Sequence, residues 1–156
     1  MSKEFIEENI IEKEYFEDLN KIKETIKINQ NKAMVVVNTS MIINYYEIGV
    51  IINQRKTWGN KYITRLSLDL KEYGNGYSTS NLKRMSQLAS NFNEVEIRAH
   101  PVLQLGWSHL ILIMQKSKSH DEMLWYINEA YKNKWSRTIL GNKIKMKSYE
   151  LGLIEH

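Results

Sequence analysis

A three-part pattern occurs three times in this chain: an aromatic residue, a serine directly after it, and a leucine five positions after the aromatic residue. Serine is a preferred helix N-cap because its hydroxyl accepts a hydrogen bond from an otherwise unpaired N–H of the first turn. An aromatic residue just before the cap can pack on a leucine at the fourth helical position. The pattern therefore predicts three helices opened by Ser78, Ser108 and Ser136. The three copies are Tyr77–Leu82, Trp107–Leu112 and Trp135–Leu140.

The rest of the chain is also helical in pattern. One proline and seven glycines among 156 residues favour long helices, and strand signals are weak throughout. Gly49 interrupts an apolar helix, which indicates that another helix passes close to it, and Gly74 is a predicted helix stop. The segment 93–102 around Pro101 is predicted to be a loop or extended piece. We therefore predict an all-α helical bundle with little or no β structure, with helices at 4–28, 32–55, 61–73, 78–91, 108–115, 121–132 and 136–147.

Charge divides the chain unevenly. Residues 1–24 hold eight acidic and four basic side chains, whereas residues 25–156 hold ten acidic and 18 basic ones. The segment 132–147 carries six cations and no acid. We expect an acidic amphipathic helix or arm at 1–30, followed by a helical domain at 31–150. A basic body suits a polyanion-binding domain, and a solvated lysine-rich surface explains the same composition.

Several classes of site are disfavoured. The chain has no cysteine, and its four histidines lack zinc-site spacing. In the Asp69–Lys71 segment, an acidic residue and a lysine have the minimal spacing found in the active site of a metal-dependent nuclease. The segment lies in a helical pattern, however, and no strand precedes it. We therefore expect no catalytic residues, no metal and no cofactor. Neither a signal peptide nor an uncharged membrane-length apolar run is present, so we expect a cytoplasmic protein without membrane contact.

Two pairs of predicted helices form candidate helix–turn–helix units, 61–73 with 78–91 and 121–132 with 136–147. A DNA-reading unit of this kind places the start of its second helix in the major groove. We assign sequence recognition to helix 78–91 and non-specific backbone contact to helix 136–147. Two helical hairpins that simply pack together, with solvated polar faces, remain the alternative. The candidate contacts are Thr79, Ser80, Lys83, Arg84 and Gln87, with Lys61 and Arg65 for phosphates, and Arg137, Thr138, Lys143 and Lys145 on the last helix.

Seven segments occur in an order and spacing that resemble a known family. They are "YYEIG" at 45–49, "WG" at 58–59, "LSLDL" at 66–70, "YSTSNLKRM" at 77–85, "QLGWSH" at 104–109, "LWYINEA" at 124–130 and "NKWSRTIL" at 133–140. Together they resemble the N-terminal domain of the bacterial YhcG family over roughly residues 33–147. Tyr46 stands where a tryptophan is more familiar, and Gly106 where proline or serine is more usual.

The resemblance implies a helical, DNA-binding domain that other members join to a C-terminal nuclease domain of the PD-(D/E)xK type. That nuclease domain is expected to be absent from this chain, so the resemblance implies a targeting domain without catalytic activity of its own. Its implied partners are double-stranded DNA and the nuclease domain of the parent protein. The alternative is a protein–protein interaction or dimerisation module that forms a homodimer. An autonomous enzyme is disfavoured because no convergent polar site is apparent.

Overall fold

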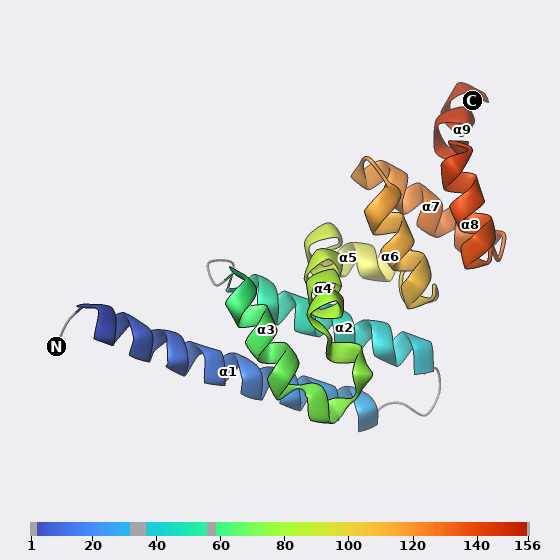
Figure 1. Ribbon diagram of the computed structural model, residues 1–156. Coiled ribbons are helices and arrows are strands. Elements are labelled where there is room, and N and C mark those ends of the chain that lie inside the picture. The colour runs from blue at the N-terminus through green and yellow to red at the C-terminus, as the bar shows by residue number, and fades with distance from the viewer. Residues whose placement is uncertain (1–2, 32–36, 56–58, 156) are drawn as a thin grey trace. The chain divides into compact units, whose positions relative to one another are not determined.

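The computed structural model describes residues 3–31, 37–55 and 59–155 (Figure 1). These residues are all-α, and no strand occurs among them. The α-helices are α1 (Lys3–Asn31), α2 (Val37–Asn53), α3 (Gly59–Asp69), α4 (Thr79–Asn91), α5 (Glu94–Ala99), α6 (Trp107–Lys116), α7 (His120–Lys132), α8 (Arg137–Lys145) and α9 (Ser148–Glu155), and two 3₁₀ turns are η1 (Lys71–Tyr73) and η2 (Asn75–Tyr77).

The chain divides into two compact units. Unit 1 comprises residues 1–35 and 43–90, and unit 2 comprises residues 36–42 and 91–156. The all-α prediction is confirmed, and the predicted start of the second helix at 32 lies outside the described residues. Across the described residues, no helix combines the length and the apolar character needed to cross a membrane.

Helix α1 is an integral part of unit 1. One face of this helix is buried, with side chains at spacings of four and three residues, as the helical period requires of a packed face. These side chains are Tyr15, Leu19, Ile22 and Ile26. Asp18 is fully buried beside them and accepts hydrogen bonds from two donors on other segments. This polar anchor and the apolar face together hold the acidic helix within unit 1.

Gly49 confirms the predicted close approach of two helices. A Cβ at this position of α2 would lie 2.0 Å from the carbonyl oxygen of Met85 and 3.0 Å from the Cβ of Ala89. The obstacle is mainly the backbone of α4, which cannot rotate away as a side chain could. Glycine is therefore required here for α2 and α4 to pack at this distance.

The link between α3 and α4 is longer than predicted. Helix α3 ends at Asp69 rather than at residue 73, and two 3₁₀ turns fill most of the link at residues 70–78. The change from α-helix to the tighter 3₁₀ turn begins at the buried Leu70. Its carbonyl accepts a hydrogen bond from the N–H of Tyr73, an i→i+3 bond. Gly74 has φ +124°, a conformation that disfavours any side chain, and it caps η1 rather than the α-helix that it was predicted to stop.

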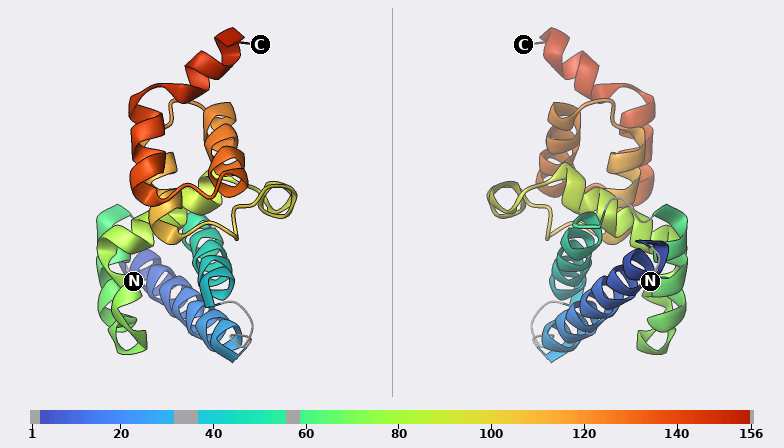
Figure 2. Two further views of the ribbon diagram at one scale, coloured as in Figure 1. Left: turned by 90° about the vertical axis from the view of Figure 1, so that its right-hand side faces the viewer. Right: turned by 90° about the vertical axis from the view of Figure 1, so that its left-hand side faces the viewer.

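Unit 2 is organised around α6, which contacts both α7 and α8, while α9 contacts α7 and α8 (Figures 1 and 2). Leu110 and Ile113 of α6 are fully buried, as are Tyr126 and Ile127 of α7 and Leu140 of α8. An amphipathic face on each of these helices supplies the core of the unit.

Helix α5 corrects the prediction of a loop or extended piece at 93–102. Asn93 accepts from the N–H of Glu96 at 2.8 Å, and the Glu96 carboxylate accepts from the N–H of Asn93 at 3.2 Å. This reciprocal capping box stabilises a six-residue helix in front of Pro101. Helix α9 was also not predicted.

Two of the three predicted serine caps are confirmed. The Ser78 hydroxyl accepts from Asn81 N–H at 3.1 Å, and the Ser136 hydroxyl accepts from Ile139 N–H at 3.2 Å. The third was wrong: Ser108 lies inside α6, whose N-cap is Gly106, because the helix begins two residues earlier with the Leu110 N–H bonded to the Gly106 carbonyl. Ser119, which caps α7 through Glu122 N–H at 3.1 Å, was missed.

Candidate nucleic-acid interface

Helix α4 has one buried face and one polar face. The Ser78 cap fixes its first turn, and Leu82, Met85 and Leu88 are fully buried at spacings of three residues. A helix anchored along one stripe in this way presents its opposite stripe to solvent. The side chains of that stripe are therefore held in a defined order along a rigid element.

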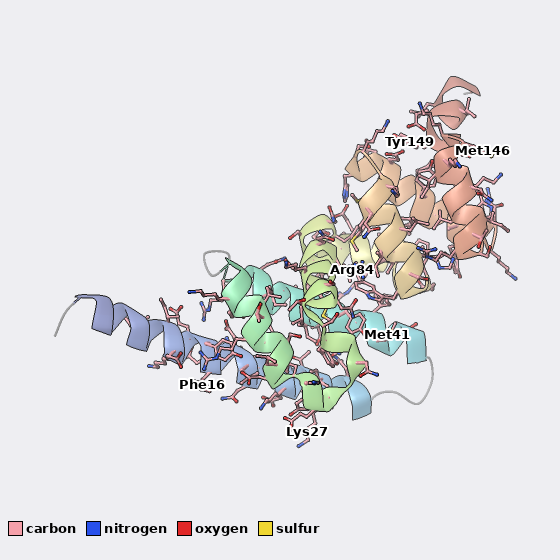
Figure 3. The ribbon with its side chains drawn as sticks, in the orientation of Figure 1. Phe16, Lys27, Met41, Arg84, Met146 and Tyr149 are labelled. Atoms are coloured by element: carbon pink, nitrogen blue, oxygen red, sulfur yellow. The ribbon has the colours of Figure 1, made fainter. Side chains whose placement is uncertain are left out.

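All five recognition residues predicted on α4 lie on or beside this polar stripe. Ser80, Lys83 and Gln87 are exposed and follow one another at spacings of three and four residues, whereas Thr79 and Arg84 are half-buried at its flanks. Figure 3 labels Arg84 on α4. The structure thus gathers two cations and three hydrogen-bonding side chains in the first nine residues of the helix.

The two α3 residues predicted to contact phosphates are in different situations. Lys61 is exposed. Arg65 donates two hydrogen bonds to the Glu12 carboxylate, at 2.7 and 3.3 Å, and its guanidinium carbon lies 4.0 Å from the centre of the Tyr15 ring. A phosphate would therefore compete with Glu12 for Arg65, whereas the exposed Lys61 is accessible from solvent.

The second predicted set lies on α8, in unit 2. Arg137, Thr138 and Lys145 are exposed. Lys143 is half-buried, with its ammonium nitrogen 5.5 Å from the centre of the Trp135 ring, within the range of a cation–π contact. The structure therefore places the two predicted sets on separate units, one on α4 with α3 and one on α8.

The turn between α7 and α8 is short and well defined. The Trp135 N–H bonds to the Ala130 carbonyl at 3.0 Å and the Lys134 N–H bonds to the Tyr131 carbonyl at 3.3 Å, which is the hydrogen-bond pattern of a Schellman motif. Lys134 adopts φ +53° at the position where glycine is usual. A four-residue link at 133–136 matches the turn length of a helix–turn–helix more closely than the nine-residue link at 70–78 does.

The polar network around α1 is structural in character. Tyr62 donates to the buried Asp18 at 3.0 Å, and Arg55 Nε donates to the same carboxylate oxygen at 3.0 Å. Burial raises the pKa of the Tyr62 hydroxyl well above its ordinary value, and the Asp18 charge raises it further. Tyr15 donates to Asp69, so this carboxylate of the Asp69–Lys71 segment serves the attachment of α1 to α3. Among the described residues, no three acidic or histidine side chains converge as metal ligands.

The sequence interpretation missed a hollow in unit 2, which we call the Tyr131 hollow. It has a volume of about 510 Å³ and lies where the end of α7 faces the segment before α6. The sequence signal for it is "YKNKW" at 131–135, where two aromatic residues flank two lysines. Periodicity cannot reveal it, because a hollow depends on which segments fold beside one another. Its lining includes Leu105, Ala130, Tyr131, Lys132, Lys134 and Trp135.

Comparison with known protein families identifies the family of the chain. The DUF1016 N-terminal domain, which is the N-terminal domain of the YhcG family, matches residues 21–151. The chain belongs to this family. The matched residues include α4, the α7–α8 turn and α8 entire, so both predicted contact surfaces lie within the family domain. No curated protein matches the chain, and no solved structure matches it.

Proposed function

We propose that this DUF1016 N-terminal domain binds double-stranded DNA and serves as the targeting part of a YhcG-family nuclease. The observation that carries the proposal is the polar stripe of α4. Its hydroxyl, amide and cationic side chains begin at a capped helix N-terminus, the part of a recognition helix that meets base edges and phosphates. The nuclease domain of the parent protein is the expected covalent partner of this domain.

Helix α8 supports the same proposal through charge. The acid-free segment from Ala130 to Tyr149 includes the whole of α8, and its exposed Arg137 and Lys145 can each neutralise a phosphate. This helix offers more charge than α4 but fewer groups that distinguish one base pair from another. We therefore propose that α4 provides recognition and α8 provides backbone contact.

A salt series tests the proposal. The full chain is titrated into labelled duplex, single-stranded and branched DNA at several salt concentrations. Each phosphate neutralised on duplex DNA contributes about −0.9 to the slope of log affinity against log salt, so several contacts predict a steep decline. Duplex binding that ignores salt, or no duplex binding even at low salt, would exclude the proposed function.

Protein association is the second candidate function, and exposed apolar side chains favour it. Ile10, Ile11 and Phe16 of α1 are each about half exposed, and Leu68 of α3 is 70% exposed. Phe16 is labelled on α1 in Figure 3. Sedimentation over a wide range of protein concentrations decides this candidate: a dimer that Phe16→Glu dissociates supports association, and a monomer at all concentrations contradicts homodimerisation.

A further inference from the structure

The lining of the Tyr131 hollow combines buried apolar side chains with aromatic and cationic ones. Leu105 and Ala130, which line it, are almost completely buried, whereas Tyr131 is 52% exposed. Lys132 and Lys134 line it as well, and among the residues that the structure describes no acidic one does. A volume of about 510 Å³ falls within the range of about 300–1,000 Å³ typical of small-ligand pockets.

The turn that carries these side chains is fixed on two sides. The Schellman hydrogen bonds tie Trp135 and Lys134 to the end of α7. His109 of α6 lies 2.9 Å through its Nε2 from the Trp135 carbonyl oxygen. Because a carbonyl can only accept, Nε2 is the donor, and this bond connects the turn to α6. The backbone of the turn is therefore ordered before any ligand arrives, which reduces the entropic cost of binding.

Further cationic and polar groups adjoin the hollow. Lys143 of α8 lies over the Trp135 ring, so a third cation stands next to the two in the lining. A second hollow, of about 420 Å³, shares Gln104, Tyr131 and Lys132 with the first and adds Arg98 together with the acidic Glu129. Tyr131 therefore stands between two adjoining spaces with cations on both sides of it.

We propose that the Tyr131 hollow binds an unpaired nucleotide, with its base stacked on Tyr131 and its phosphate held by Lys132 and Lys134. Aromatic side chains interleaved with cations bind single strands, because every base offers a stacking face and every phosphate a charge. A base within a duplex is already stacked and cannot enter a concave site unless it is extruded. The domain would then recognise DNA in which duplex and single strand meet, and this reading rests on the proposed DNA-binding function.

The experiment uses the full chain and three labelled probes at low salt: a blunt duplex, a single strand, and the same duplex with an unpaired overhang. Replacing Tyr131 by alanine should weaken binding to the overhang and the single strand by roughly tenfold, since stacking contributes about 1–3 kcal/mol per base. Tyr131→Phe keeps the ring and should retain the affinity. Lys134→Gly removes a cation without straining the backbone and should lower the single-strand salt slope by about 0.7.

Lys118→Gln is the matched control, because it removes one exposed cation of unit 2 outside the hollow and should leave the overhang preference unchanged. Circular dichroism verifies that each variant is folded. A fall of the overhang affinity toward that of the blunt duplex in Tyr131→Ala, with the blunt duplex bound as before, supports both proposals. Unchanged overhang binding in Tyr131→Ala beside intact duplex binding overturns the hollow alone. Tyr131-dependent single-strand binding without duplex binding overturns the duplex function alone, and no binding to any probe overturns both.

Discussion

At the scale of single residues, the buried Asp18 explains how an acidic helix can be part of a folded core. Its side chain is fully buried among apolar neighbours, and one carboxylate oxygen accepts from both Arg55 and Tyr62. A buried charge left without partners is strongly destabilising, so these donors specify where α1 packs. The sequence suggested only an acidic helix or arm here, because the donors are 37 and 44 residues away from Asp18.

Tyr62→Phe is expected to destabilise the protein by about 1.5–3 kcal/mol, the range for a hydrogen bond to a charged group.

The same variant is expected to change how stability depends on pH in alkaline solution. Burial and Asp18 raise the Tyr62 pKa in the folded state, so above pH of about 10 the unfolded chain loses this proton first and stability falls with rising pH. Urea unfolding from pH 7 to 11 should give a shallower decline above pH 10 in Tyr62→Phe than in the wild type.

Tyr73→Phe in the turn Lys71–Tyr73 controls for the loss of one tyrosine hydroxyl from unit 1. The prediction is contradicted if Tyr62→Phe matches Tyr73→Phe in stability at neutral pH. That result would mean that the hydrogen bond to Asp18 contributes nothing to folding.

At the scale of helices, two of the three serine caps predicted from the sequence are confirmed and the third is not. Ser78 and Ser136 cap helices as predicted, because each follows a turn that holds it in an extended conformation. Ser108 resembles them in sequence, yet Gly106 already has the extended backbone of an N-cap, at φ −67° and ψ 154°. Which residue caps a helix depends on how the preceding chain, here the segment 101–105, reaches it, and a local pattern does not contain that information.

Ser136→Ala is expected to lower stability by about 1 kcal/mol, because the Ile139 N–H loses its partner. Ser108→Ala removes the same atom from inside the first turn of α6 and should change stability by less than about 0.5 kcal/mol. Thermal unfolding followed by circular dichroism measures the loss of stability in each of the two variants. Equal losses in the two variants would show that Ser108 also acts as a cap.

Two helical glycines should respond to alanine in opposite directions. Gly49→Ala places a methyl group against the Met85 carbonyl of α4 and should destabilise by at least about 1–3 kcal/mol. At Gly141 a Cβ would lie 3.7 Å from Leu112 Cδ2, an ordinary contact, so Gly141→Ala should stabilise α8 by up to about 1 kcal/mol. Denaturant unfolding of both variants measures the sign of the change in the free energy of unfolding. Stabilisation by Gly49→Ala would contradict the close packing of α2 on α4.

At the scale of the whole molecule, the sequence predicted the helical class and the family, whereas the division into two units emerged only from the structure. The family match begins at residue 21, inside α1, so the predicted domain boundary at residue 31 remains a prediction. Periodicity and caps are local properties and were readable from the sequence. The Tyr131 hollow and the pairing of Arg65 with Glu12 join segments distant in sequence, which is why the candidate site was predicted only in part.

The two proposed DNA-contacting helices can be separated by experiment because they belong to different units. Lys83→Glu with Arg84→Glu should abolish the preference among duplex sequences, because Lys83 lies on the polar stripe of α4 and Arg84 at its flank. Removing Lys143 and Lys145 as alanines should weaken all sequences alike and make the salt slope less steep by about 0.9 per lost contact. Lys21→Glu with Lys27→Glu, two exposed positions on α1, is the charge-matched control for the α4 variant.

Competition binding with a pool of duplex sequences measures affinity and preference together. The assignment of recognition to α4 requires that the Lys83 and Arg84 variant lose preference while the α1 control keeps it. If the α4 variant is folded and retains both affinity and preference, α4 is a packing element, and α8, which follows the shorter turn, becomes the recognition helix. If the α1 control loses as much binding as the α4 variant, net charge rather than a specific surface governs DNA binding.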